Sequence, residues 1–320
     1  MFNDLAFIIG TSLMYSTPLI YTALGGTISE NGGVVNIGLE GMMSFGAFMA
    51  AAIGFYSGNP WIGFLAGGLA GMSLALLHAI ATVTYRADHV VSGIALNFLG
   101  PGLALFLSRL MFEGATMTRP LDLTNKIPQP LRSFFAEGNG PFQRNGFFGI
   151  ILNQYATVYL VFFLVALVWF FLYRTRFGLR LRSVGEHPEA ADSLGINVFR
   201  MKYIAVLLSG AMAGFGGAAM SIAVVSRFSP TLISGQGFIA LAAMIFGKWK
   251  PQGAMLASLM FGFAQGLAIY LGNPRVGVNV PGEILSMIPY VLTLIILIFQ
   301  GKLLGRTVGP RALGKPFYKS

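Results

Sequence analysis

The feature that most constrains this chain is a succession of long apolar stretches with very little charge inside them. The first, Leu5–Ile28, contains no charged residue. A helix needs about 20 apolar residues to cross roughly 30 Å of hydrocarbon, because it rises 1.5 Å per residue. Nine stretches are long enough or nearly so: about 5–28, 34–56, 60–85, 90–112, 153–174, 201–225, 233–248, 253–272 and 283–300. We therefore expect an all-α integral membrane protein, a polytopic bundle of about nine spans in which 233–248 is a partial span.

Composition argues against the soluble alternatives. Of the 320 residues, 55% are hydrophobic and 10% are charged, and the mean hydropathy is +0.71. An ordinary soluble domain is about 25% charged, so this chain has too few charges to cover a surface that faces water on all sides. The absence of Cys excludes disulfides, thiolate metal sites and Cys nucleophiles.

The positions of Lys and Arg predict the orientation of the spans, because these residues gather on the cytoplasmic side. Six follow the fifth span: Arg174, Arg176, Arg180, Arg182, Arg200 and Lys202. The tail carries five more: Lys302, Arg306, Arg311, Lys315 and Lys319. Four spans separate the two groups, an even number, so both are predicted to be cytoplasmic. The C-terminus is then cytoplasmic, and the N-terminus and the loop 113–152 lie outside.

Two regions resemble each other. The first runs from Gly41 to a Gly58-Asn-Pro-Trp break followed by a Gly-rich apolar helix. The second runs from Ala240 to a Trp249-Lys-Pro-Gln-Gly break followed by another Gly- and Ala-rich helix. The predicted orientation places the two breaks on opposite sides of the membrane. We therefore take an inverted-topology repeat, which is common in transporters, as a hypothesis.

The segment from Gly25 to Met43 predicts a broken helix at membrane depth. It contains six glycines, two carboxylates and two asparagines between apolar runs, and each Gly costs a helix about 1 kcal/mol relative to Ala. Irregular backbone at this depth must be surrounded by protein or by a watery cavity. Glu40 and Asn36 either pin this broken helix by hydrogen bonds or contact the transported substrate, and the sequence leaves both roles open.

A short helix is predicted between the fifth and sixth spans. Pro188 suits the first helical position, Glu189 suits the positive end of the helix dipole, and Gly195 is placed to end the helix. Such a helix, with a small apolar face on the cytoplasmic side, is shaped to dock in a groove of another protein. The residues expected to make this contact are Glu186, His187, Pro188, Glu189, Ala190, Ala191, Leu194 and Gly195.

Three motifs carry a resemblance to a known family. The run 189–196 resembles the coupling helix of ABC-transporter permeases, which fits a cleft of the ATP-binding subunit. The stretch 34–43 and the run 235–253 resemble the permease branch that serves branched-chain amino acids, simple sugars and nucleosides. The stretch 34–43, together with the Ser29-Glu-Asn-Gly-Gly that precedes it, is most similar in sequence to the shorter permease of bacterial nucleoside importers. The resemblance covers roughly residues 15–300.

The resemblance implies the fold, the location and the partner subunits of a complete transporter. It implies a type II ABC importer fold in the bacterial cytoplasmic (inner) membrane, with residues 1–320 as one transmembrane permease domain. Residues 175–200 would be the cytoplasmic coupling loop and 113–152 the extracytoplasmic loop. The implied partners are a sister permease, an ABC ATPase with two nucleotide-binding domains and an extracytoplasmic substrate-binding protein. This chain has no Gly-x-x-x-x-Gly-Lys-[Ser/Thr] loop, so we expect no cofactor and no enzymatic activity in it, with ATP and Mg²⁺ on the ATPase.

Nucleosides are the expected cargo, with simple sugars or branched-chain amino acids as the alternative. A nucleoside is neutral, so aromatic faces and amide or hydroxyl groups suffice along its path. The candidates are Asn36, Glu40, Asn97, Phe98 and Gln265. His78 is expected to be buried and hydrogen-bonded, whereas His89 and Asp88 are expected in a solvated ion cluster beside Arg86.

An ion-coupled secondary transporter is the less favoured alternative. Such carriers place ionisable groups deep in the bundle. In this sequence, Glu40 is essentially the one carboxylate expected at that depth. A secondary transporter also has no use for a docking helix.

Overall fold

The computed structural model describes residues 2–122, 126–138, 140, 142–273, 281–303 and 309–318. Over these residues the chain is helical, without strands. Seven helices are long and apolar enough to cross a membrane: Asn3–Asn31, Leu39–Ser57, Pro60–Thr84, His89–Met111, Ala156–Arg174, Val198–Val225 and Pro251–Leu271. Each coincides with one of the predicted apolar stretches, which confirms the polytopic helix bundle.

The two remaining stretches form shorter helices. The helix α10 (Gln236–Phe246) has 11 residues, as expected of a partial span. The stretch 283–300 divides into α12 (Gly282–Ser286) and α13 (Ile288–Leu303). Of the predicted basic tail, Arg306 and Lys319 lie outside the described residues.

Three helices form the centre of the bundle: α1 (Phe2–Asn31), α2 (Leu39–Ser57) and α9 (Val198–Ala218). Their backbones approach closely because glycines face one another. A Cβ on Gly46 would lie 2.5 Å from the Cα of Gly214, and one on Gly25 would lie 2.6 Å from the carbonyl oxygen of Ser209. Such small-residue contacts replace the hydrophobic driving force that is missing between helices in lipid.

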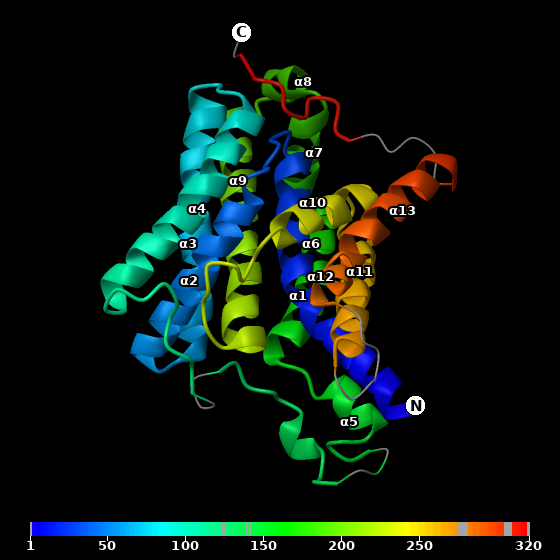
Figure 1. Ribbon diagram of the computed structural model, residues 1–320. Helices are drawn as coiled ribbons and strands as arrows, with labels where there is room; N and C mark the ends of the chain where they lie inside the picture. Colours follow the sequence, from blue (N-terminus) through cyan, green and yellow to red (C-terminus); the bar gives the residue numbers. More distant parts are fainter. Residues whose placement is uncertain are drawn as a thin grey trace.

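Two helical hairpins turn in opposite directions along the bundle (Figure 1): the α2–α3 turn lies at the lower end of the view, and the α10–α11 turn lies in its upper half. The helix α2 ends at Gly58, whose φ is +65°, and Asn59 caps α3 (Pro60–Ala79). The helix α10 ends at Gly247, and α11 (Pro251–Leu271) also begins with a proline. Proline suits the first helical position because its missing N–H has no intrahelical partner there. Short π-helical turns, η1 (Ile80–Thr84) and η4 (Ala219–Val225), extend α3 and α9.

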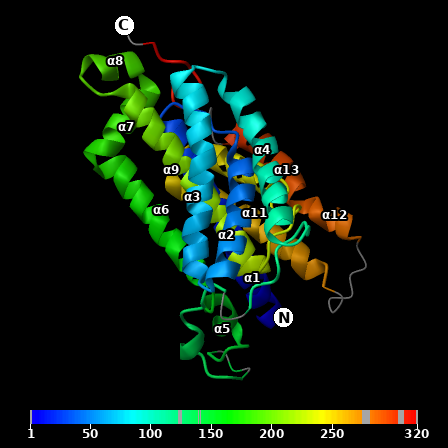
Figure 2. The same cartoon turned by 90° about the vertical axis from the view of Figure 1, so that its left-hand side faces the viewer.

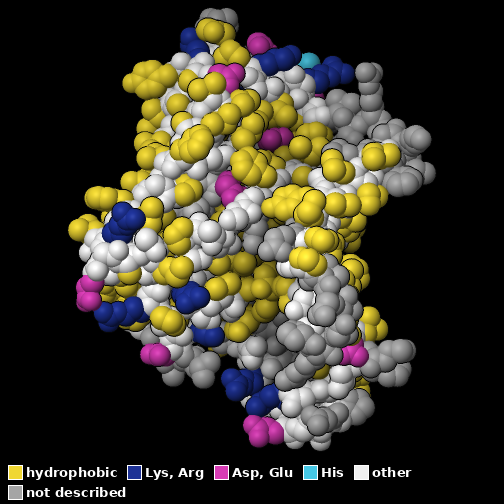
Figure 3. Space-filling view, viewed as in Figure 1, with side chains coloured by type: hydrophobic (Ala, Val, Ile, Leu, Met, Phe, Trp, Pro, Cys, Tyr) yellow, Lys and Arg dark blue, Asp and Glu magenta, His cyan; other side chains and the backbone are white. Residues whose placement is uncertain are grey.

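The two ends of the bundle carry different structures (Figures 1 and 2). At one end lie α7 (Arg176–Glu186), α8 (Pro188–Ser193) and the C-terminal segment. At the other lie the N-terminus, α5 (Phe147–Leu152) and the long loop that follows α4 (His89–Met111). Between these ends, α6 (Ala156–Arg174) runs along the bundle. Figure 3 shows apolar side chains across the middle of one face, with acidic side chains near its centre.

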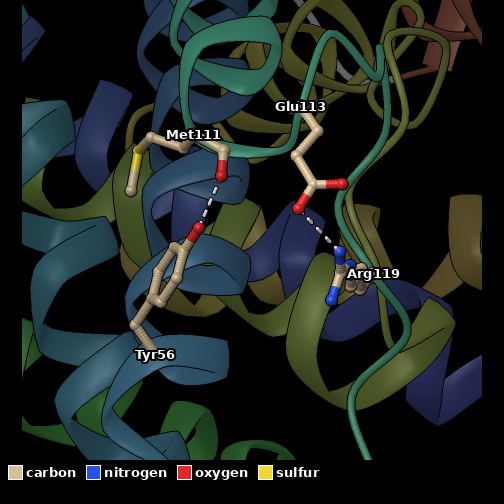
Figure 4. A network of polar contacts seen from close by, with 4 residues as sticks. All are labelled: Tyr56, Met111, Glu113 and Arg119. Carbon is tan, nitrogen blue, oxygen red and sulfur yellow. Dashed lines mark hydrogen bonds and ion pairs between the residues drawn. The ribbon is translucent and has the colours of Figure 1, made fainter.

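The long loop is tied to the helix ends beneath it. The Tyr56 hydroxyl at the end of α2 donates to the Met111 carbonyl at the end of α4 (2.5 Å), and Arg119 pairs with Glu113 at 3.2 Å (Figure 4). Further along, the backbone N–H of Leu121 donates to the Ser226 carbonyl after η4 (2.8 Å). The start of the loop therefore lies along the bundle.

Candidate functional site

A broken segment at residues 32–38 connects α1 to α2, as the glycine-rich sequence predicts. At its end, Glu40 lies in the first turn of α2 and faces the start of α10. The carboxylate oxygens accept the backbone N–H groups of Gly235 and Gly237, each at 2.6 Å. A carboxylate also complements the positive end of the α10 dipole. Glu40 therefore joins two helices that begin inside the bundle.

Two asparagines fasten the same segment. Asn36 is fully buried, and its side-chain amide donates to the Ser209 hydroxyl on α9 (3.0 Å). Asn97 on α4 donates to the Ile37 carbonyl (3.0 Å) and accepts from the Gly41 backbone N–H (2.9 Å). These contacts favour the pinning role over substrate contact for Asn36 and Asn97.

Two histidines bind the backbone N–H and C=O of one residue of the segment, Val35. His78 Nε2 lies 3.0 Å from the Val35 carbonyl oxygen, and its Nδ1 lies 2.9 Å from the Ser92 hydroxyl. His78 is fully buried, so its predicted role is confirmed. The expectation for His89 is wrong. It is 5% exposed, and its Nδ1 accepts the Val35 backbone N–H at 3.1 Å. An irregular backbone leaves N–H groups without helical partners, and His89 meets that need.

The predicted docking helix forms with the expected ends. Pro188 occupies the first turn of α8, and Gly195 adopts a φ of +78° after its last turn. The helix α7, which the sequence did not predict, precedes it and is capped by the Thr175 hydroxyl, which accepts from the Gly178 backbone N–H (3.2 Å). The two helices together form an angular projection at one end of the bundle (Figure 2).

The side chains of this projection divide between two faces. Six of the eight predicted contact residues are exposed: Glu186, His187, Glu189, Ala190, Leu194 and Gly195. Leu194 is 81% exposed, which is unusual for a large apolar side chain. Pro188 and Ala191 are buried, so the expectation that these two residues contact a partner is wrong. A six-residue helix needs one buried side to stay attached.

A groove runs beside the exposed side of this projection. Its volume is about 440 Å³, and it is lined by Phe177, Arg180, Leu194, Gly195, Ile196, Asn197, Arg200, Met201 and Ile204. It combines apolar side chains with two guanidinium groups. Such a lining suits a protein surface that offers an apolar side chain beside an acidic one.

The C-terminal segment 309–318 crosses the same end of the bundle, a position that was not predicted from the sequence. The Ala312 N–H donates to the Gly185 carbonyl on α7 (2.9 Å), and the Gly314 N–H donates to the Gly33 carbonyl in the broken segment (3.2 Å). The Lys202 ammonium on α9 donates to the Lys315 carbonyl (3.3 Å). The segment thus contacts α7, the broken segment and α9 together.

The two remaining pathway candidates lie elsewhere. Phe98 on α4 is 79% exposed and points away from the bundle. Gln265 on α11 lines a pocket with Tyr15 and with Gln236 of α10. Gln236 was missed because nothing in its sequence surroundings marks it. It lies between the two glycines that bind Glu40.

The comparisons with known proteins place this chain in a family. A family model described as branched-chain amino acid transport system / permease component matches residues 8–297. The nucleoside ABC transporter permease protein NupC of Lactococcus lactis is 43% identical, over 99% of this chain and 98% of the relative. The guanosine ABC transporter permease protein NupQ of Bacillus subtilis is 44% identical, over 98% and 97%.

A third relative is named for a different substrate. TsgC13 of Haloferax volcanii, by name a glucose ABC transporter permease protein, is 34% identical over 91% of this chain and 90% of its own. All three names describe permeases of ABC transporters, and all three matches span nearly the whole chain. The protein is therefore a multi-pass membrane permease of the family of branched-chain amino acid transport system permease components.

Proposed function

We propose that this chain is a permease subunit of an ATP-driven, binding-protein-dependent nucleoside importer. The observation that carries the proposal is its 43–44% identity, over nearly full length, to two permeases named for nucleosides and guanosine. The path also suits a neutral cargo, because the carboxylate of Glu40 is occupied by backbone N–H groups. Simple sugars are the second candidate, favoured by the 34% identity to a permease named for glucose.

The exposed side of α8 and the adjoining groove would dock on the ATPase. Leu194 would supply the apolar anchor, and Arg180 and Arg200 would face acidic side chains of the partner. ATP and Mg²⁺ would be bound by that partner, because no phosphate loop is present in this sequence.

Motion at the ATPase would reach the broken segment through α7. A Cβ on Gly185 would lie 2.2 Å from the Asn31 carbonyl oxygen, so the end of α7 touches the end of α1 directly. Displacing α7 would therefore move the 32–38 segment and, through Glu40, the start of α10. Such a rigid-body change alternates between two packed arrangements rather than deforming continuously.

The remaining partners would lie on other faces. A sister permease would cover α4, the least buried of the seven long helices, with 22% of its most hydropathic window inside the bundle. The binding protein would meet the loop 113–152 on the extracytoplasmic side, and α7, α8 and the C-terminal segment would be cytoplasmic. The N-terminus would lie outside, in the bacterial cytoplasmic membrane.

The test is uptake by the complete transporter, reconstituted in proteoliposomes with sister permease, ATPase and binding protein. We expect uptake of labelled guanosine and inosine only with ATP inside the vesicles. Uptake of glucose or leucine in place of nucleosides would refute the cargo. Undiminished uptake without the ATPase would refute the ABC mechanism in favour of a secondary carrier.

The docking surface is tested in the same preparation with Glu189→Arg and Gly195→Val. We expect both variants to lose most uptake and to retain less ATPase on purification. Lys126→Ala, on the loop at the opposite end of the bundle, is the control for ATPase retention and should retain the ATPase as the parent does.

A further inference from the structure

A polar pocket lies next to the contact between Glu40 and α10. Its volume is about 340 Å³, and it lies between α1, α10, α11 and the pair α12 and α13. Small-molecule sites usually have volumes of roughly 300–1,000 Å³. The lining consists of Tyr15, Ser234, Gln236, Ile239, Gln265, Ala268, Ile269, Leu285, Pro289 and Tyr290. The pocket therefore has the size of a ligand site, and it lies at the start of α10, the partial span.

Two side-chain amide oxygens in this pocket lack partners among the described residues. Gln236 Oε1 and Gln265 Oε1 are buried atoms, and neither has a hydrogen-bond partner among the described residues. A buried acceptor left unpaired destabilises the fold, because it loses its hydrogen bonds to water and gains none in return. The two glutamines come from different helices, α10 and α11, so their meeting in one pocket is a property of the fold. A ligand with hydrogen-bond donors would satisfy both.

The chemistry of the lining limits what that ligand can be. Among the residues that the structure describes, the pocket lining includes no Lys, Arg, His, Asp or Glu. A phosphate or the charged groups of an amino acid would lose water there without gaining a counter-charge, which is costly. A neutral molecule with alternating donors and acceptors on its edge could instead form hydrogen bonds with the amides, since each amide has a donor N–H and an acceptor oxygen. The rings of Tyr15 and Tyr290 supply flat apolar surface.

We propose that this pocket binds the nucleobase of the cargo during transport, with Gln236 and Gln265 hydrogen-bonding its edge. The inference rests on the proposed function, and it assigns a binding site within this chain to a cargo that the binding protein delivers. Its position has a consequence for transport. Gln236 lies between Gly235 and Gly237, whose N–H groups bind Glu40, so any displacement of α10 moves one wall of the pocket.

The experiment measures binding of labelled guanosine to the assembled permease pair and ATPase in nanodiscs, without binding protein. The variants are Gln236→Leu and Gln265→Leu, examined separately because they lie on different helices. The matched control is Gln252→Leu, an exposed glutamine in the first turn of α11. We expect each pocket variant to weaken guanosine binding at least roughly tenfold, the effect of losing about 1.4 kcal/mol, and the control to bind like the parent protein.

The outcomes separate this inference from the proposed function. Binding by both pocket variants within twofold of the parent, or no guanosine binding by the parent, would overturn the nucleobase pocket. Guanosine uptake by the complete transporter would leave the importer function standing in that case. Equal displacement of bound guanosine by glucose and by inosine would also overturn the assignment to the base. Size-exclusion profiles and thermal unfolding of each variant verify that the subunits remain assembled.

Discussion

Glu40 and Gly237 meet at 2.6 Å, the side chain of one in the first turn of α2 and the backbone N–H of the other in the first turn of α10. A Cβ on Gly237 would lie 2.5 Å from the Glu40 Cα, so the glycine is what permits the contact. One carboxylate thereby supplies partners for the N–H groups that no helical carbonyl can reach at the start of α10.

Replacing Glu40 by Ala should therefore loosen α10 from α2. Two charge-assisted hydrogen bonds disappear and two buried N–H groups lose their partner, so we expect a loss of about 2–3 kcal/mol in the free energy of unfolding. Thermal unfolding in nanodiscs measures the effect. Glu113→Ala is the control, because its carboxylate is exposed and pairs with the exposed Arg119. Equal unfolding temperatures for the two variants would contradict the role given to Glu40.

Neighbouring residues on α4 should respond differently to substitution. Asn97→Leu removes the bonds to the Ile37 carbonyl and to the Gly41 N–H, and it should cost about 2 kcal/mol of stability. Phe98→Ala, one residue later, should leave the stability of the isolated subunit within about 0.5 kcal/mol, because the side chain is 79% exposed. Unfolding of the purified subunit in detergent compares the two. A larger loss for Phe98→Ala would mean that α4 is oriented differently.

A matched pair of glycines tests the crossing of α2 and α4. A Cβ on Gly100 would lie 2.2 Å from the Gly41 carbonyl oxygen, whereas one on Gly102 meets nothing within 4 Å. Gly100→Ala should force the helices apart and cost more than about 2 kcal/mol, while Gly102→Ala should be neutral or slightly stabilising, since Ala is the better helix former. Expression level and thermal unfolding report both effects. Similar behaviour of the two variants would argue against this crossing.

The sequence allowed some of these features to be predicted and not others. The length of apolar runs predicted the seven long helices and the short α10, because the bilayer fixes how many residues a span needs. Pro188 and Gly195 predicted the ends of α8, because their backbone preferences act locally. The family motifs predicted the permease identity that the comparisons confirm.

Contacts between distant residues could not be predicted. The partners of Glu40 are backbone N–H groups about 195 residues away, and backbone groups have no sequence signature. Likewise His89 looks like a solvated residue beside Arg86 and Asp88, yet the irregular backbone at Val35 draws it into the interior. The roles of Glu40, Asn97, Phe98 and Gln265 in transport remain predictions, and so does docking on the ATPase.

The exposed Leu194 offers a sharper test of docking than Glu189→Arg or Gly195→Val. Leu194→Asp should abolish co-purification of the ATPase. It should not alter the stability of the isolated permease, because the side chain is 81% exposed. Ala191→Asp is the contrasting variant. It places a charge where Ala191 is 2% exposed and should destabilise α8 itself. Normal ATPase binding by Leu194→Asp would place the docking surface elsewhere on the chain.

The C-terminal segment should be held in place largely by one aromatic contact. Phe317 is 4% exposed and packs edge-on against Phe199, with ring centroids 5.4 Å apart. Phe317→Ala should free the segment locally, because the attachments described for it otherwise are single hydrogen bonds of about 1 kcal/mol each and the exposed contact of Tyr318 with Arg86. Hydrogen exchange should therefore accelerate at Ala312 and Gly314, whose N–H groups are bonded to Gly185 and Gly33, while the long helices keep their protection.

The neighbouring Tyr318 supplies the control for that experiment. It is 62% exposed, and its ring lies 4.4 Å from the Arg86 guanidinium carbon, a contact worth about 0.5–1 kcal/mol at an exposed site. Tyr318→Ala should therefore change exchange at the two N–H groups much less than Phe317→Ala does. Equal acceleration in both variants would contradict the leading role given to Phe317, because the contact of Tyr318 with Arg86 would then hold the segment as strongly as the buried ring does. Unchanged exchange in both would show that the backbone bonds to Gly185 and Gly33 suffice to hold it.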